Sequence, residues 1–263
     1  DGDFRPEVHD SDGLLYHSEE GEWTWRPLAN PKRLAVLSAP LQNPRGFGLM
    51  QRDWLFDHYQ DLEARYEKRP SLWIEPLSEW GEGNVELVEI PTEQEIHDNI
   101  VAYWVPAKTP ETDADGQPKD ETPEYPRTMT FAYRMRWLQP HRPVHELGRV
   151  MATRIAAGNS PEMMKFVLDF EGDELSELPA GAGLTSIVTV GNGARLIEKQ
   201  LQKNEATGGW RLVFQVAPEA ESGLKTLFPS PAGRPRIRLS ALLKRGENIP
   251  EPLTETWTYD LHP

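Results

Sequence analysis

The chain has 263 residues, which is long enough for one large domain or two of ordinary size. Acidic residues outnumber basic ones by 42 to 28, and the net charge of −14 argues against a nucleic-acid partner, whose phosphates need a basic surface. The same charge disfavours anionic membrane surfaces, no run of about 18 apolar residues could span a bilayer, and no cysteine is present for disulfide or thiol chemistry. A neutral polyol is compatible with this acidity.

Most of the predicted elements are short β-strands. Trp23 and Trp25, two residues apart, are expected on one face of a strand, and the spacing of apolar residues over 56–66 predicts one or two helical turns that end before Pro70. Alternating or β-branched runs predict strands over 85–90, 100–105 and 128–137. Residues 106–127, rich in Pro, Asp, Glu and Thr, predict a mobile loop between two of these strands.

A second group of strands follows a break over residues 139–148, which we interpret as a linker between domains 1–138 and 149–263. Strands are predicted over 166–170, 186–190, 195–201, 211–216, 236–239 and 254–259. Their spacing, with glycine-containing turns at 191–193 and 207–209, fits a small immunoglobulin-like sandwich. The predicted fold class is therefore all-β.

Residues 66–104 combine tryptophans with carboxylates, a tyrosine and an arginine. Flat aromatic rings suit the apolar faces of pyranoses, and polar groups beside them bind the hydroxyls, so the segment favours a sugar polymer as ligand. Aromatic residues on strands more often fill a core, and at most two of the tryptophans are expected to touch sugar. Trp137, Trp210 and Trp257 are expected in the sandwich core.

This segment, with GEWTWRPLANPK at 21–32 and GFGLMQRDW at 46–54, closely resembles the periplasmic glucan biosynthesis proteins of the MdoG family, including its OpgG and OpgD branches. The resemblance extends over nearly the whole chain and is densest in 1–105. It implies a periplasmic protein with a large β-sandwich domain that handles glucan, followed by an immunoglobulin-like domain. It also implies that the N-terminal part of the first domain is missing, so that residues 1–138 are its C-terminal portion.

The resemblance also implies site residues. Glycoside hydrolysis uses two carboxyl groups, one protonated to assist the leaving oxygen and one to activate water or attack the sugar. Asp98 matches the family's general acid, and Asp10 matches a base that activates water through a relay. Side-chain chemistry, rather than the resemblance, suggests the substrate-binding residues Tyr66, Arg69, Glu95, Trp73, Trp80 and Trp25, although Arg69 is equally suited to a structural ion pair with Glu67 or Glu75.

The residues alone leave other interpretations open. Asp98 followed by Asn99, and the segment HDSDG over 9–13, are also typical of turns, in which Gly13 is free to take a positive φ. Asp10 and Asp12 suggest calcium, but the third oxygen position and the distal Glu of an EF-hand are missing. No GxSxG elbow, P-loop, GxGxxG or HExxH motif occurs in the sequence.

The favoured hypothesis is an endo-acting, inverting β-1,2-glucanase of osmoregulated periplasmic glucan synthesis, acting without a cofactor. The alternative is a non-catalytic scaffold that holds glucan for backbone or branching enzymes. The expected partner is a β-glucan polysaccharide, without nucleic-acid binding or membrane insertion. The resemblance leaves open a homodimer and contacts with other glucan-synthesis proteins. A purely structural adhesion protein would not explain the cluster over residues 66–104.

Overall fold

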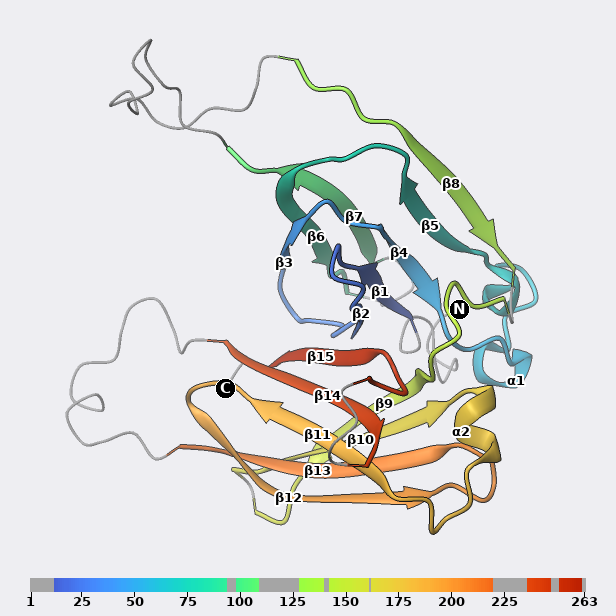
Figure 1. Cartoon of the computed structure of the whole chain (residues 1–263), viewed down its shortest axis with the longest axis vertical. Coiled ribbons are helices and arrows are strands. Elements are labelled where there is room, and N and C mark those ends of the chain that lie inside the picture. Colours follow the sequence, from blue (N-terminus) through green and yellow to red (C-terminus); the bar gives the residue numbers. More distant parts are fainter. Residues whose placement is uncertain are drawn as a thin grey trace, which may run out of the picture. The chain divides into compact units, whose positions relative to one another are not determined.

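The computed structural model describes residues 12–93, 98–108, 128–139, 142–160, 162–219, 236–246 and 251–261. Nearly all of its regular structure is β-strand (Figure 1), which confirms the predicted all-β class. The helices in these ranges are α1 (Phe56–Tyr59), the 3₁₀ helix η2 (Tyr66–Lys68) and α2 (Asp173–Glu177). None of them is long and apolar enough to cross a membrane.

The chain divides into two compact units, each described separately below. The first contains Asp1–Trp23 and Leu28–Arg142, and the second contains Thr24–Pro27 and Pro143–Pro263. The main boundary thus falls between Arg142 and Pro143, inside the break that the sequence shows over 139–148.

The first unit is built from two antiparallel sheets. One has the strand order β1-β4-β5-β8 and the other the order β3-β6-β7. Their bounds are β1 (Asp12–His17), β3 (Ala35–Gln42), β4 (Gly46–Gln51), β5 (Ser71–Pro76), β6 (Glu82–Ile90), β7 (Asn99–Pro106) and β8 (Tyr133–Leu138). The strands predicted over 85–90 and 100–105 are confirmed, and the one predicted over 128–137 is confirmed only for 133–137, because residues 128–132 form no strand. Most of the predicted loop, residues 109–127, lies outside the described residues.

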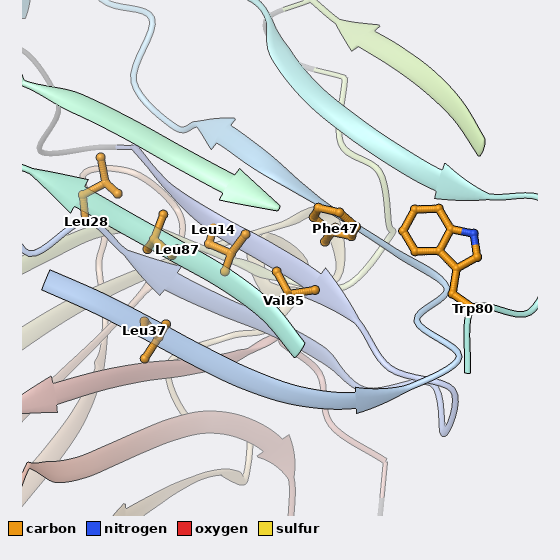
Figure 2. Close-up of a cluster of buried hydrophobic side chains, with 7 residues drawn as sticks. All are labelled: Leu14, Leu28, Leu37, Phe47, Trp80, Val85 and Leu87. Carbon is orange, nitrogen blue, oxygen red and sulfur yellow. The ribbon is translucent and has the colours of Figure 1, made fainter. Parts of the chain in front are cut away.

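The two sheets of the first unit meet in one hydrophobic core (Figure 2). Leu14 of β1 and Phe47 of β4 contribute from one sheet, and Leu37 of β3 with Leu87 of β6 from the other. Alternation along each strand sends one face inward, as in a β-sandwich. The cluster consists of Leu14, Leu28, Leu37, Phe47, Trp80, Val85 and Leu87.

Close contact between β4 and β5 depends on a glycine. A Cβ on Gly48 would lie 1.9 Å from the carbonyl oxygen of Leu72, which is backbone and cannot move aside without distorting the sheet. We expect Gly48→Ala to lower the free energy of unfolding by about 1–3 kcal/mol. Gly181→Ala is the control, because no atom lies within 4 Å of its added Cβ. Equal thermal unfolding midpoints for the two variants would contradict this packing.

The one or two helical turns predicted over 56–66 are present as α1 and the start of η2, which are separated where Gln60 and Arg65 adopt a left-handed conformation. One expectation for the first unit is wrong. Trp137, expected in the core, is 64% exposed. It lies on β8, the last strand of its sheet, where alternation predicts a strand but does not determine whether a second layer covers it.

The second unit also contains two sheets, with the strand orders β12-β13-β10-β9 and β11-β14-β15-β2. Trp257 of β15 contacts Phe166 of β10 and Phe214 of β13, so a buried aromatic cluster joins the sheets. Trp210 and Trp257 are buried as predicted. The bounds are β2 (Trp23–Pro27), β9 (Arg149–Ala157), β10 (Met164–Glu171), β11 (Leu184–Val190), β12 (Ala194–Lys203), β13 (Trp210–Pro218), β14 (Ile237–Arg245) and β15 (Thr256–Leu261).

Strand β2 brings an early part of the sequence into the second unit. It pairs in parallel with β15, and Trp25 lies opposite Trp257 in the register. The Thr258 hydroxyl donates a hydrogen bond to the Trp25 carbonyl oxygen at 3.4 Å, and the Arg26 guanidinium lies 5.0 Å from the Tyr259 ring centroid. Residues 24–27 are therefore part of the second unit's core, which a sequential division at residue 139 does not anticipate.

A buried carboxylate links three strands of the second unit. Asp169 on β10, 7% exposed, accepts bonds from Arg211 Nε at 2.6 Å and Nη2 at 2.8 Å, and from Arg154 Nη1 at 2.7 Å. Burial favours the neutral carboxyl, but the bonds from Arg211 and then Arg154 outweigh it, so the pKa of Asp169 lies below its ordinary value of 3.8.

This network predicts a pH-dependent stability. A carboxyl whose pKa is lowered by folding stabilises the protein fully above its unfolded pKa and loses that contribution as pH falls through the folded pKa. We expect Asp169→Asn to cost about 1.5–3 kcal/mol at pH 7 and progressively less as the pH drops below 3.8. Urea unfolding at several pH values measures this, with the exposed Asp173→Asn as the control. A pH-independent cost would contradict the role of the charge.

Candidate functional site

A pocket of about 330 Å³ in the first unit contains two of the residues singled out from the sequence, Arg69 and Asp98. Its polar groups have opposite charges and its remaining wall is apolar, which is the composition of a site for a polar organic ligand. The pocket is lined by Asp12, Leu28, Leu49, Met50, Gln51, Arg69, Pro70, Asp98, Asn99 and Ile100.

The apolar wall of the pocket is continuous with the core of the first unit. Leu28 belongs to the buried cluster, and Leu49 and Ile100 pack against it. Side chains held in a close-packed core have few alternative positions. The wall is therefore a preformed surface onto which the C–H face of a sugar ring can pack.

Asp98 immediately precedes β7 and is half-buried. The backbone N–H of Thr92 donates a hydrogen bond to its Oδ1 atom at 2.6 Å. This bond connects the end of β6 to the start of β7 and fixes the orientation of the carboxyl group. Oδ2 is therefore the oxygen through which Asp98 can exchange a proton or bind a hydroxyl.

Tyr66 begins η2, and Arg69 directly follows its last residue. The Arg69 guanidinium stacks over the Tyr66 ring, 4.1 Å from its centroid, and the Arg69 backbone N–H donates to the Tyr66 carbonyl oxygen at 3.1 Å. Tyr66 is buried and packs against Tyr59, with 5.9 Å between ring centroids. Tyr66 thus supports the arginine, which is itself exposed and lines the pocket.

Asp12 and Gln51 line the pocket but were not singled out from the sequence as site residues. They are partners in the antiparallel register of β1 and β4. Asp12 and Gly13, read from the sequence as part of a turn, begin strand β1, and Gly13 is not among the glycines with positive φ. The pairing of two strands 39 positions apart brings Asp12 into the site, and no local pattern in the sequence encodes that pairing.

The three tryptophans expected to contact substrate occupy the cores of the two units. Trp25, Trp73 and Trp80 are 2%, 3% and 9% exposed, and none lines the pocket. Trp73 packs against Trp23 at 5.4 Å between ring centroids, and Trp80 packs against Trp104 at 5.9 Å. Protein therefore covers these rings, which contribute buried apolar surface rather than an open stacking surface.

Two predicted site residues, Asp10 and Glu95, lie outside the described residues. Among the described residues, no cluster of three or more His, Asp or Glu side chains is arranged to hold a metal ion. The positive charge of Arg69 in the pocket also opposes a divalent cation beside Asp12 and Asp98.

The chain is similar in sequence to known proteins of one family. The family model described as "Periplasmic glucan biosynthesis protein, MdoG" matches residues 1–261. "Glucans biosynthesis protein G" of Pseudomonas putida is 43% identical over 224 residues, covering 81% of this chain and 38% of that relative. The protein of the same name from Pseudomonas entomophila is 44% identical over 224 residues, covering 81% of this chain and 36% of the relative. The chain thus spans well under half the length of these relatives.

Proposed function

Because the chain belongs to the MdoG family of periplasmic glucan biosynthesis proteins, we propose that it acts in the synthesis of osmoregulated glucans in the periplasm. Its proposed reaction is the endo-acting hydrolysis of β-1,2-glucan with inversion at the anomeric carbon. A trimming reaction of this kind sets the length of the polymer. It proceeds by acid–base chemistry of protein side chains and uses no cofactor.

The main support for this proposal is that Asp98 and Arg69 line the same pocket. The sequence matches Asp98 to the family's general acid and marks Arg69 as a donor for sugar hydroxyls. The pocket adds a second carboxylate and an apolar wall, which together suit the hydroxyls and C–H faces of glucose units.

In the proposed mechanism, Asp98 is the general acid. Thr92 N–H holds Oδ1, so Oδ2 carries the proton that passes to the glycosidic oxygen as the bond to the anomeric carbon breaks. A water molecule attacks that carbon from the opposite face and gives up a proton. Asp10 is the proposed acceptor of this proton, through a relay of water rather than by direct contact.

The stereochemistry of the product tests this mechanism. Proton NMR during the first minutes of hydrolysis of linear β-1,2-glucan is expected to show the new reducing ends as the α-anomer, before mutarotation mixes the two forms. Initial appearance of the β-anomer would mean retention and a covalent intermediate, and would contradict the assigned roles. Glucan binding with no new reducing ends would instead favour the scaffold function.

A further inference from the structure

The pocket contains a second carboxylate whose place in the fold is well fixed. Asp12 begins β1, and its backbone carbonyl oxygen accepts a hydrogen bond from the Leu28 N–H at 2.9 Å. Its partner in the register, Gln51, donates its backbone N–H to Ser71 Oγ at 2.9 Å. Strand pairing on one side and this bond to β5 on the other hold the segment in position.

The side chain of Gln51 is hydrogen-bonded to backbone carbonyl groups. Its Nε2 donates to the carbonyl oxygens of Asp53 at 2.6 Å and Tyr66 at 2.8 Å. A primary amide has two N–H donors, and both are directed at these carbonyls. Gln51 therefore joins β4 to η2, and its amide hydrogens are not available to a ligand.

Arg69 is available as a donor on the same pocket. No hydrogen-bond acceptor for its guanidinium is found among the described residues, and its position is maintained by stacking on Tyr66. The pocket thus combines carboxylate acceptors, Asp12 and Asp98, with a guanidinium donor. A ligand that matches this set must both donate and accept hydrogen bonds and carry no strong charge, which describes the hydroxyls of a neutral sugar.

We propose that Asp12 is a substrate-binding residue, whose carboxylate accepts hydrogen bonds from hydroxyl groups of a glucosyl unit while Arg69 donates to the same unit. This inference rests on the proposed function, because it places that unit of the glucan in the pocket with Asp98. The apolar wall formed by Leu28, Leu49 and Ile100 receives the C–H face of the ring. Asp12 binds and orients the sugar and does not transfer a proton.

Glucan binding in a catalytically inactive background tests the role of Asp12. In an Asp98→Asn background, isothermal titration with linear β-1,2-glucan is expected to show affinity about tenfold or more weaker when Asp12→Asn is added, because a charged acceptor is lost. Arg69→Gln is expected to act in the same direction. Asp57→Asn, an exposed aspartate on α1 outside the pocket, is the matched control. Circular dichroism verifies that each variant is folded.

Steady-state kinetics separates binding from proton transfer. In the active protein, Asp12→Asn is expected to raise KM about tenfold while kcat changes by no more than about threefold. Unchanged affinity and KM would overturn the role of Asp12 while leaving the hydrolase proposal standing. A large loss of kcat at constant KM would also overturn it, because it would assign Asp12 to the chemical step. Failure of the Asp98→Asn protein and of the intact protein to bind glucan would overturn the proposed function and this inference together.

Discussion

Replacing Asp98 by asparagine is expected to lower kcat for hydrolysis of linear β-1,2-glucan by about 10²- to 10⁴-fold. The amide keeps the shape of the carboxyl and leaves an oxygen to accept the Thr92 N–H, but it has no proton to give to the leaving oxygen. Release of reducing ends, measured as initial rates at several glucan concentrations, gives kcat and KM separately.

Two comparisons make this loss interpretable. Asp57→Asn removes a carboxylate of the same size from the surface of the same unit, and its activity is expected to match that of the intact protein. Glucan binding by Asp98→Asn is expected to persist, because Asp12 and Arg69 remain in the pocket. An Asp98→Asn protein with unchanged kcat would show that the acid is another residue.

Replacing Trp257 by alanine is expected to lower the free energy of unfolding of the second unit by about 3–5 kcal/mol. Its indole is fully buried, contacts Phe166 and Phe214, and donates a hydrogen bond to Thr153 Oγ1 at 3.0 Å. The substitution leaves a cavity at the point where the two sheets meet. Urea unfolding followed by far-ultraviolet circular dichroism measures the change.

Trp137→Ala is the matched control for this substitution. It removes the same side chain from a strand, but Trp137 is 64% exposed whereas Trp257 is 0% exposed. An exposed position outside a special network is expected to change stability by no more than about 0.5 kcal/mol. Similar losses for both variants would contradict the described difference in burial.

Much of the β architecture was predictable from local patterns. Alternation over Val85–Ile90 predicted a strand that the structure extends to Glu82–Ile90, and the run at 100–105 lies within β7. These predictions succeed because a period of two residues is imposed by the strand itself and by one buried face. The helical turns predicted over 56–66 form as α1 and η2, but side-chain periodicity does not report the left-handed conformations at Gln60 and Arg65 that separate them.

Long-range placement was not predictable in the same way. Trp25 and Trp257 are paired across most of the chain, in a parallel contact between β2 and β15. The burial of Trp257 and the exposure of Trp137 likewise depend on which strands lie inside a sheet and which at its edge. Strand order is set by tertiary packing, and local residue patterns contain no direct record of it.

The candidate site likewise combines residues that the sequence indicates with residues that only the fold brings together. Family resemblance indicated Asp98 and side-chain chemistry indicated Arg69, and both line the pocket. Asp12 and Gln51 join them only through the register of β1 with β4, which aligns residues from separate segments. Residue type alone predicts more contacts between tryptophans and sugar than their burial allows, because a ring that fills a core and a ring that stacks on sugar look the same in the sequence.

The most direct test of the proposed function is whether the intact protein generates reducing ends from linear β-1,2-glucan, with glucan binding measured on the same preparation. We predict cleavage into shorter oligosaccharides together with saturable binding. Binding without cleavage would contradict the hydrolase assignment and leave a scaffold that holds glucan for other enzymes. Absence of both binding and cleavage would contradict the assignment of the pocket containing Asp12, Arg69 and Asp98 to β-1,2-glucan.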